Sequence, residues 1–554
     1  MKKTFLLSCL MLAAMPVMAA YTGHVYVDKN KNGVFDQSEK PLAGIKVSDG
    51  LNVVETAADG SFTLPGHERE RFIFITTPSG YKTFNRHYHK IEKKQSGYDF
   101  GLIPYSGRIR KNGSHRYIHI ADTEIFNTEN HADWVNNVRD YARNEQAAFI
   151  IHTGDICYEK GLKAHIKLMN TENMDCPVFY CIGNHDLVKG KYGEELFESI
   201  YGPVYYSFDA GNVHYVVTPM PGGDHAPGYT SDDVCRWLKN DLAHIRPGTP
   251  VVVFNHDLLT YEDTFIFKSK NAGSINLNEY NLKAWVYGHW HINYMKKQGD
   301  VYSVCTSSLD KGGIDHSTTA FRVMHVDSKG DFTSELRYTY LDKNICIASP
   351  AGVMASGVLP VAVNVYSSVS PVREVLYTCL ADGKPVLKNK RLLQSTDWSW
   401  NGELPLSHKY VGKELTLRVT ARFNNGEIAE AESHFICRTE KAVPLFSADW
   451  DNLSGNAKHS APVSAPLNLP LQLAWTNNVG ANLYMTSPLI HKGKVIVASV
   501  DEDLKGVGHV YALNGKDGTI LWSCPVRNSI KNSIAVDSDI VFAQDAQGFL
   551  YAID

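Results

Sequence analysis

The stretch AAFIIHTGDICY, residues 147–158, decides the fold, because seven strand-like residues run directly into Gly154 and Asp155. VFYCIGNHD (178–186) and KAWVYGHWH (283–291) repeat this arrangement. In each case a pattern typical of a buried β-strand ends at a glycine that permits a sharp turn, and carboxylate, amide or imidazole side chains follow. Open α/β sheets place their sites at the carboxyl ends of their strands, so we expect these side chains to meet at one edge.

The surrounding residues, 113–330, alternate strand-like and helix-like patterns, which predicts an α/β layered domain. Further strands are expected at RYIHIA (116–121), VHYVVT (213–218) and PVVVFNH (250–256). Helices are expected at 131–144, 161–172, 191–200 and 231–245.

Five polar clusters follow the predicted strands of this domain. They are Asp122-Thr-Glu124, Gly154-Asp155-Ile-Cys-Tyr158, Gly183-Asn184-His185-Asp186, Asn255-His256 and Gly288-His289-Trp-His291. Two metal ions ~3.5–4 Å apart require such a set, namely a shared anionic bridge with nitrogen and oxygen ligands on each side. The sequence therefore predicts a dinuclear metal site.

The clusters resemble, in the same order, those of the calcineurin-like metallophosphoesterase superfamily, and GDxxY with VxxH is similar to the purple acid phosphatase branch. The resemblance implies a four-layer α/β/β/α core. It also implies the ligand roles: Asp155 bridges both metals, Asp122 and His291 hold the first, and Asn184, His256 and His289 hold the second. His185 would lie beside the substrate, where it stabilises the transition state or protonates the leaving oxygen.

One position departs from the usual pattern of that superfamily, which begins with Asp-x-His, whereas this chain has Asp122-Thr-Glu124. Glu124 could ligate the first metal as a carboxylate, which would favour a harder ion such as Mn²⁺ or Fe. Alternatively, Tyr158 supplies a phenolate, as purple acid phosphatases do with ferric iron. We expect two metal ions, divalent or of the Fe/Mn type, and both ligands stay open here.

The resemblance implies hydrolysis of a phosphate mono- or diester by a metal-bridging hydroxide, since two cations lower the pKa of a shared water. His225, Lys311 and His316 lie on Gly-rich loops that could contact a small-molecule or lipid phosphate ester. A phosphatase-fold binding protein with impaired catalysis is the alternative, and the unusual Glu124 motivates it. An inert carbohydrate-binding scaffold without any metal is a third hypothesis.

Residues 21–105 alternate short apolar runs with turn signals, which predicts a small antiparallel β-sandwich. Within it, residues 28–39 fit a calcium-loop template with strands on either side instead of helices. The ligands of this template would be Asp28, Asn30, Asn32, the carbonyl of Val34, Asp36 and Glu39. The module resembles the prealbumin-like or SdrD B-type repeats of bacterial surface proteins. The alternative interpretation is a plain Asx-rich turn.

The rest of the chain is expected to be β-rich, so the fold class is multidomain α/β plus β. Residues 331–440 predict a second β-sandwich-like module, and 441–470 read as a linker. In residues 471–554, VYALN at 510 returns as LYAID at 550, a period of 550 − 510 = 40. This period is typical of propeller blades, and YALNGKDGTILW resembles the PQQ-like repeat. We expect a truncated β-propeller that holds no quinone.

Residues 1–20 have the basic start, short apolar run and small-residue site of a secretory signal peptide, which places the chain in the periplasm, at the outer surface or outside the cell. No later run is long enough for a transmembrane helix. Net charge is −4, from 55 Lys and Arg against 59 Asp and Glu, and it gives no indication of nucleic-acid binding. Cys346–Cys437 or Cys157–Cys181 could form disulfides in such a compartment.

Overall fold

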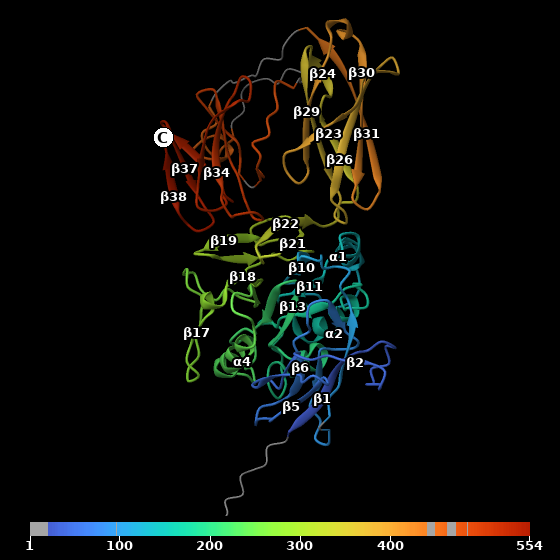
Figure 1. Cartoon of the computed structure of the whole chain (residues 1–554). Coiled ribbons are helices and arrows are strands. Elements are labelled where there is room, and N and C mark those ends of the chain that lie inside the picture. The colour runs from blue at the N-terminus through green and yellow to red at the C-terminus, as the bar shows by residue number, and fades with distance from the viewer. Residues whose placement is uncertain (1–19, 96, 440–448, 462–472, 485) are drawn as a thin grey trace, which may run out of the picture.

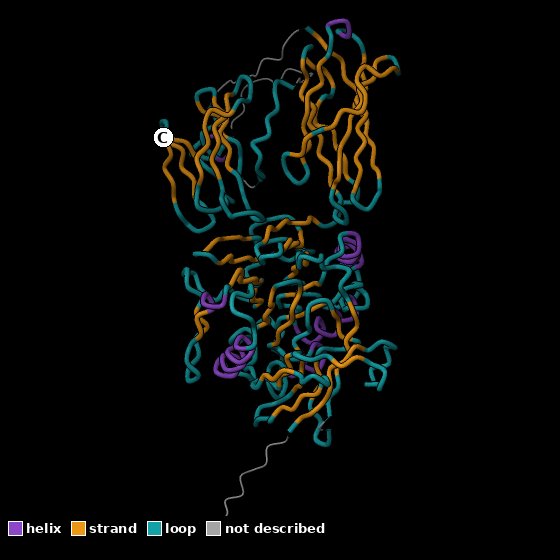
Figure 2. The backbone as a smooth tube through the Cα atoms, viewed as in Figure 1, coloured by secondary structure: helices purple, strands orange, loops and turns teal. Residues whose placement is uncertain are grey.

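The computed structural model describes residues 20–95, 97–439, 449–461, 473–484 and 486–554. Figure 1 shows an elongated molecule in which an N-terminal β-rich unit and a central α/β unit lie below two further β-rich units. Helices are confined to the central unit apart from single short turns, and strands dominate elsewhere, as Figure 2 shows. The predicted signal peptide lies outside the described residues, as does most of the predicted linker.

The N-terminal unit is built from two β-sheets around one small core. The first sheet, in the order β2–β1–β9–β7 with β5 also paired to β1, consists of β1 (Tyr21–Val27), β2 (Lys40–Pro41), β5 (Ser61–Leu64), β7 (Tyr81–Thr83) and β9 (Phe100–Pro104). The second, in the order β4–β3–β6–β8, consists of β3 (Lys46–Ser48), β4 (Val53–Glu55), β6 (Phe72–Ile75) and β8 (Tyr88–Lys90). Val25, Val47 and Phe62 belong to the buried cluster between them. The predicted sandwich was antiparallel, whereas β1 and β9 pair in parallel in the first sheet.

The central unit contains two larger sheets. One has the order β12–β11–β10–β21–β22, from β10 (His115–Ile120), β11 (Phe149–His152), β12 (Val178–Tyr180), β21 (Ala320–Val326) and β22 (Phe332–Tyr338). The other has the order β13–β14–β15–β18–β20–β19, from β13 (Tyr206–Ala210), β14 (Val213–Val217), β15 (Val251–Phe254), β18 (Leu282–Tyr287), β19 (Tyr294–Gln298) and β20 (Val301–Cys305). A small hairpin joins β16 (Ile266–Phe267) to β17 (Ile275–Asn276), followed by the 3₁₀ turn η1 (Leu277–Tyr280).

The two central sheets face each other across an aromatic core. Tyr117 of β10 packs on Phe254 of β15 with ring centroids 5.7 Å apart, and Phe149 of β11 packs edge-on against Phe208 at 4.9 Å. The next residues along β10 and β11, Ile118 and Ile150, point to the opposite face and join a separate cluster with helix α1 (Ala132–Asn144). Strands buried on both faces explain why these stretches are continuously apolar in sequence.

Three more helices complete the central unit: α2 (Tyr158–Leu168), α3 (Glu195–Tyr201) and α4 (Ser231–Ala243). All four predicted helices are confirmed, although α2 begins at Tyr158 instead of residue 161. The start of α4 is fixed by a capping box, in which Thr230 accepts the Asp233 N–H and the Asp233 carboxylate accepts the Thr230 N–H. Trp237 of α4 packs near Phe74 of the N-terminal unit, so the two units share one core.

The upper part of the molecule is all-β. One unit pairs β23 (Asn344–Ser349), β25 (Val358–Tyr366), β28 (Leu393–Gln394) and β29 (Ser399–Pro405) in one sheet, and β24 (Gly352–Ala355), β26 (Val372–Ala381), β27 (Lys384–Arg391), β30 (Glu414–Phe423) and β31 (Ile428–Arg438) in a second. The other unit has an antiparallel sheet of β32 (Leu489–His491), β33 (Lys494–Ala498), β34 (His509–Asn514) and β35 (Ile520–Pro525), followed by β36 (Ala535–Asp537), β37 (Ile540–Gln544) and β38 (Leu550–Ile553). The 3₁₀ turns η2 (His408–Tyr410) and η3 (Leu453–Gly455) lie in these parts.

The last unit rests on the central unit through buried charges. The Lys531 ammonium donates to Asp315 Oδ2 at 2.8 Å and to the Asn293 carbonyl at 2.6 Å. The buried Arg322 guanidinium reaches the Glu502 carbonyl at 2.8 Å. Asn293 lies close to the predicted ligand His291 in sequence. Asp315 directly follows Ile314, whose N–H donates to the His291 carbonyl. This interface therefore lies beside the predicted site.

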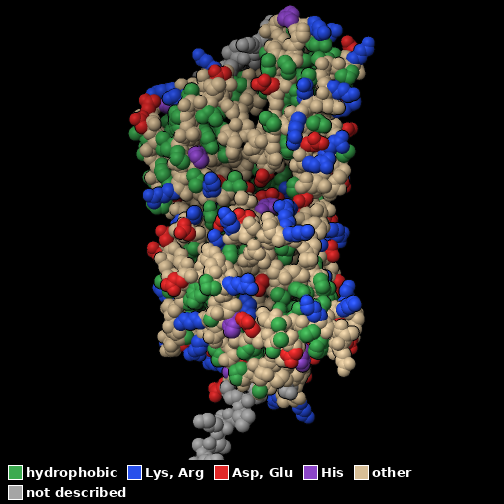
Figure 3. Space-filling view, in the orientation of Figure 1, with side chains coloured by type: hydrophobic (Ala, Val, Ile, Leu, Met, Phe, Trp, Pro, Cys, Tyr) green, Lys and Arg blue, Asp and Glu red, His purple; other side chains and the backbone are tan. Residues whose placement is uncertain are grey.

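Two sequence expectations about the whole chain have structural outcomes. The nine cysteines of the described residues are all free, so neither suggested disulfide is formed. Among the described residues, no helix combines the length and the apolar character that crossing a membrane requires. On the face in Figure 3, acidic and basic side chains are interspersed, and no large area carries one sign of charge.

Candidate metal centre

The predicted ligands converge because they follow strands that run in the same direction. β10, β11 and β12 are parallel in one sheet, and β15 and β18 are parallel in the other. Asp122 and Asp155 follow β10 and β11, whereas His256 and His289 follow β15 and β18. The site therefore lies at the edge where the carboxyl ends of both sheets meet, as expected for such folds.

Two glycines leave the space in which the ligands approach one another. A Cβ atom on Gly154 would lie 2.7 Å from His256 Nδ1 and 2.7 Å from the Gly183 nitrogen. A Cβ atom on Gly288 would lie 2.8 Å from Asp122 Oδ2. Both distances are too short for any side chain, so glycine is required at these turns. This is the role that the sequence patterns predicted for them.

The ligand backbone is held in an unusual conformation. Five residues of the centre adopt left-handed φ values: Asp122 (51°), Glu124 (44°), Asp155 (56°), His289 (66°) and His291 (50°). Non-glycine residues rarely adopt this region, and each such position costs about 1–3 kcal/mol unless the surroundings enforce it. Concentration of this strain at one site is typical of functional centres.

The ligands form two overlapping groups around Asp155. We call Asn184, His256 and His289 the second half-site, and Asp122, Glu124 and His291 the first half-site. In the second, the ligand atoms of Asp155, His256 and His289 all lie within 4.8 Å of one another. Asp122, Asp155 and His291 meet the same criterion in the first. A shared carboxylate between two groups is the arrangement that two bridged metal ions need.

The second half-site contains polar atoms that lack a partner. Asn184 Oδ1 and His256 Nε2 are both buried without a hydrogen bond. His256 Nδ1 lies 2.7 Å from the Thr153 carbonyl and donates to it, which leaves the Nε2 lone pair facing the centre. Nε2 is 3.1 Å from Asp155 Oδ2, so this contact requires either a proton on Nε2 or a cation between the two atoms. His256 and Asp155 therefore fit a metal.

The charges of the buried carboxylates lead to the same conclusion. Burial raises the pKa of the Asp122 carboxyl well above its usual range, and the neighbouring negative charge of Asp155 adds to this. Burial would lower the pKa of His256, but the Asp155 carboxylate outweighs it and raises that pKa to about 9. Without a metal, the site therefore takes up protons to balance its carboxylates. Metal ions would supply that positive charge instead.

The first half-site is more open and is partly engaged by a lysine. His291 Nε2 lies 3.6 Å from both Asp122 Oδ1 and Glu124 Oε1. The Lys311 ammonium donates to Glu124 Oε2 at 3.0 Å and to the Glu124 carbonyl at 3.1 Å. The side chains of His291 and Glu124 are 24% and 25% exposed. Lys311, predicted as a substrate contact, therefore competes with a metal for Glu124.

Tyr158, the alternative ligand, is 44% exposed and lies beside the site. Its ring centroid is 6.4 Å from that of Phe126 and 5.3 Å from that of His185. Glu124, by contrast, groups with Asp155 and Cys157 at ligand distances. The geometry favours Glu124 as the oxygen ligand of the first metal.

His185 lies at the solvent side of the centre and is held by an aspartate that the sequence analysis did not select. Its Nδ1 lies 2.8 Å from Asp224 Oδ2, and its backbone N–H donates to Asp155 Oδ1 at 3.0 Å. Burial would lower the pKa of His185, but the bond to Asp224 and the charge of Asp155 together raise it. Asp224 lies in the sequence GGDH (222–225), in which the adjacent His225 is the predicted substrate contact. His225 is exposed, as is His316.

Asp186 was also not selected, although it supports the centre. It is fully buried and accepts the Cys157 N–H at 2.8 Å and the Gly183 N–H at 2.9 Å. These bonds tie the loop after β11 to the loop after β12, so Asp186 positions Asp155 relative to Asn184. Burial raises the pKa of the Cys157 thiol, which therefore stays protonated.

The predicted calcium loop is well formed in the N-terminal unit. The Asp28 and Glu39 side chains are almost fully buried. Asp36 Oδ2 accepts the Asn30 amide at 2.7 Å, and Asp28 Oδ2 accepts the Gly33 N–H at 2.9 Å. The buried Tyr26 hydroxyl has no partner. These contacts also occur in an Asx-rich turn, so calcium binding stays a prediction.

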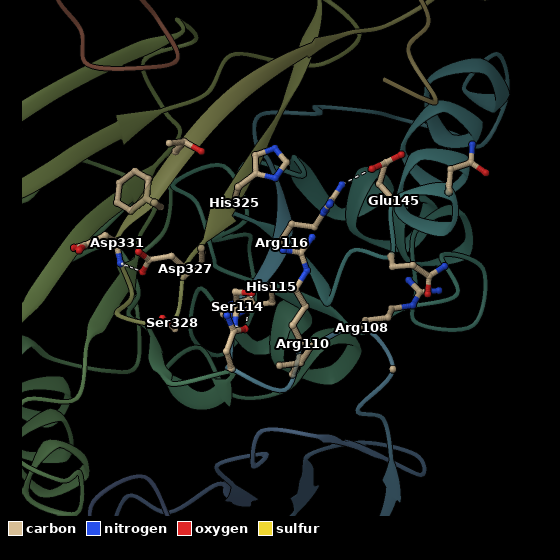
Figure 4. A pocket seen from close by; sticks show the side chains of 18 residues that line it. Arg108, Arg110, Ser114, His115, Arg116, Glu145, His325, Asp327, Ser328 and Asp331 are labelled. Carbon is tan, nitrogen blue, oxygen red and sulfur yellow. Dashed lines mark hydrogen bonds and ion pairs between the residues drawn. The ribbon is translucent and has the colours of Figure 1, made fainter. Parts of the chain in front are cut away.

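Figure 4 shows a different cavity, of about 810 Å³, at the opposite end of β10. It is lined mainly by polar side chains. Arg116 in it pairs with Glu145, and Arg108 donates to Asp175 at 2.8 Å. Because His115 begins β10 and Asp122 follows its end, this cavity does not open on the predicted ligands.

Comparison with known families agrees with the geometry of the centre. Residues 115–293 match the family described as calcineurin-like phosphoesterase, and residues 29–104 match the family described as the N terminal of calcineurin-like phosphoesterase. Residues 115–293 are therefore similar to calcineurin-like phosphoesterases, and this match supports a metal-dependent phosphoric ester hydrolase.

The individual proteins to which the chain is similar have low sequence identity to it. The chain is 26% identical over 215 residues to purple acid phosphatase 13 of Arabidopsis thaliana, and the match covers 36% of each chain. The chain thus spans about a third of the length of this curated relative. A predicted phosphoesterase from Streptococcus pneumoniae TIGR4 is similar at 12% identity and a TM-score of 0.20, over 41% of this chain and 98% of that one. BamB from Moraxella catarrhalis is similar at 12% identity and a TM-score of 0.13, over 42% and 66%.

Proposed function

We propose that the chain is a metal-dependent phosphoesterase that hydrolyses a phosphate mono- or diester with two metal ions bound around Asp155. The observation that carries the proposal is the burial of two polar atoms that have no hydrogen-bond partner within the described residues, Asn184 Oδ1 and His256 Nε2, the second of which lies 3.1 Å from Asp155 Oδ2. Such atoms are costly to bury unless a ligand satisfies them. The family match of residues 115–293 supports the same chemistry.

When bound, the two ions supply the charge that activates water and neutralises the phosphoryl oxygens. The protein residues position the other participants. Asp155 lies between the half-sites and fixes their separation. His185, which Asp224 orients and whose pKa the bond to Asp224 and the charge of Asp155 raise, can donate a proton to the leaving oxygen. Positioned proton transfer of this kind contributes about 10²–10⁴-fold in rate.

Hydrolysis of p-nitrophenyl phosphate and of bis-(p-nitrophenyl) phosphate with added Mn²⁺ tests the proposal and separates monoesters from diesters. His185→Ala should lower kcat by about 10²-fold or more, whereas His408→Ala, at an exposed histidine of the second sandwich, should not. Absence of turnover by the wild type on both esters, despite bound metal, would favour the alternative of a phosphatase-fold binding protein.

We also propose that the chain is exported and that residues 28–39 bind calcium. The signal-like residues 1–20 support the first statement, and the buried Asp28 and Glu39 carboxylates support the second. Under this proposal, the N-terminal sandwich, the second sandwich and the PQQ-like repeat units flank a four-layer catalytic core. Detection of a chain shortened at its N-terminus in a secreted fraction tests export. A rise in melting temperature with Ca²⁺ that Asp28→Asn removes tests the loop.

A further inference from the structure

A second cavity, of about 610 Å³, opens beside the metal centre and is mainly apolar. Ten of its seventeen lining residues are hydrophobic or proline. They include Met220, Leu258, Leu259, Ile266, Phe267 and Trp285. A volume between about 300 and 1,000 Å³ with a few polar groups among apolar walls is typical of a small-molecule site.

The cavity is joined to the second half-site through the residues on either side of His256. Asn255 and Asp257 both line it. Asp257 Oδ1 accepts the Trp290 indole N–H at 3.1 Å, and Trp290 directly follows the ligand His289. A molecule in the cavity would therefore touch the same loops that carry two predicted metal ligands.

A second connection leads to His185. The cavity wall includes Pro219, Met220 and Pro221 at the end of β14. Three residues later, Asp224 bonds the imidazole of His185. The same loop therefore lines the cavity with Pro219, Met220 and Pro221 and contacts His185, the proposed proton donor, through Asp224. The loops that line the apolar cavity are thus the same loops that carry His256 and the aspartate bonded to His185.

This cavity differs from the cavity of Figure 4 in its apolar lining. The larger cavity of Figure 4 is lined by three arginines, two histidines and three carboxylates, with only Ile109, Val326 and Phe332 as larger apolar side chains. The rim near His289 is apolar as well, since Tyr261, 74% exposed, stacks on Trp290 with ring centroids 5.9 Å apart. An exposed aromatic pair beside a metal site is a surface suited to an apolar ligand.

We propose that this cavity binds the apolar alcohol part of the phosphate ester, so that the preferred substrates are esters of a long-chain or aromatic alcohol. The inference rests on the proposed phosphoesterase function and names its substrate class. Polar alcohols such as simple sugars would bury little apolar surface against this wall. Each methylene that a longer alcohol buries adds about three- to fourfold in affinity.

Binding of alkylphosphonates tests the inference without catalysis, because a C–P bond is not hydrolysed. With Mn²⁺ present, calorimetry should show octylphosphonate binding at least about 30-fold more tightly than ethylphosphonate, as burial of three or more methylenes requires. The affinity of 1-naphthylphosphonate is measured in the same way. Tighter binding of the naphthyl compound would identify an aromatic alcohol, and tighter binding of the octyl compound would identify a chain. Equal affinities for the ethyl, octyl and naphthyl compounds would overturn the proposal.

Variants locate the preference. Leu258→Gln and Met220→Gln should each reduce the octyl-to-ethyl affinity ratio about tenfold, with folding verified by circular dichroism. Leu393→Gln, a 73% exposed leucine of the second sandwich, is the matched control and should leave the ratio unchanged. A preference that persists in folded Leu258→Gln and Met220→Gln would place the apolar site elsewhere and contradict the assignment. Hydrolysis of p-nitrophenyl phosphate is measured separately, so failure of the catalytic proposal and failure of the apolar site give different results.

Discussion

The two half-sites share Asp155 but differ in how completely the protein has prepared them. The second half-site has a fully buried histidine with a fixed tautomer and an amide oxygen without a partner. The first has two ligands that are about a quarter exposed, and one of them, Glu124, is bonded to Lys311. The second half-site can therefore bind a metal with little rearrangement, whereas a metal in the first would share the Glu124 carboxylate with Lys311.

This difference gives the unusual Asp-Thr-Glu sequence a physical meaning. A carboxylate in place of the usual histidine brings an extra negative charge to the first half-site, and Lys311 balances it. The ion at the first half-site should therefore be the weaker and more exchangeable of the two. We expect occupancy of this position, more than of the second, to limit activity at low metal concentration.

The largest effect is expected from removal of the shared ligand. Asp155→Asn takes away the bridging charge of both half-sites, so both ions should be lost and kcat should fall by more than about 100-fold, the upper range for partners that only support metal ligands. Elemental analysis of the purified variant and p-nitrophenyl phosphate hydrolysis measure the two losses. Retention of two ions per chain would show that Asp155 is not the bridge.

His256→Ala and His291→Ala should separate the half-sites. His256→Ala removes a buried ligand from the prepared site, so excess Mn²⁺ should not restore its activity. His291→Ala affects the weaker site, so a higher Mn²⁺ concentration should restore part of it. Activity measured against Mn²⁺ concentration gives both results. The reverse order of rescue would reject the proposed ranking of the half-sites.

The ligand of the first metal can be assigned with Glu124→Gln and Tyr158→Phe. If Glu124 binds the metal, Glu124→Gln should raise the Mn²⁺ concentration needed for half-maximal activity by about tenfold or more, and Tyr158→Phe should change it little. The iron-loaded protein supplies an independent measurement, because a phenolate ligand to ferric iron absorbs visible light. A visible band that Tyr158→Phe abolishes would assign the ligand to Tyr158.

The smallest effect should come from Lys311→Met, which has the opposite sign. Loss of the ammonium frees Glu124, so the first half-site should bind Mn²⁺ up to about fivefold more tightly, consistent with the energy of about 1 kcal/mol or less in an exposed ion pair. Lys409→Met, in the second sandwich, is the control. Weaker Mn²⁺ binding in Lys311→Met would mean that the lysine supports the ligand geometry instead of competing for it.

The convergence of the predicted ligands could be foreseen because each of them follows a strand. Asp155, His256 and His289 occupy positions fixed by local rules, in which an apolar strand ends at a glycine or directly at the ligand, and parallel pairing then brings these ends together. The same kind of local pattern predicted the four helices. Helix α2 begins at Tyr158 instead of the predicted residue 161, directly after Cys157, which has a left-handed φ.

The contacts that distinguish the half-sites could not be predicted in this way. Lys311 meets Glu124 from a loop 187 residues further along the chain, and Asp224 meets His185 across 39 residues. Loop conformation decides both pairs, and a Gly-rich loop carries no periodic pattern that fixes where a side chain points. The apolar cavity was missed for the same reason, since its wall combines Met220, Leu258 and Phe267 from separate segments.

The central claim is that two metal ions share Asp155 and that the second half-site holds its ion more tightly. Anomalous diffraction at the manganese edge from crystals soaked in limiting and then excess Mn²⁺ tests it most directly. We expect one peak beside Asn184 and His256 at limiting metal, and a second peak beside Asp122 and His291, ~3.5–4 Å away, in excess. Absence of a peak at Asp155, or a first peak on the Glu124 side, would contradict the account.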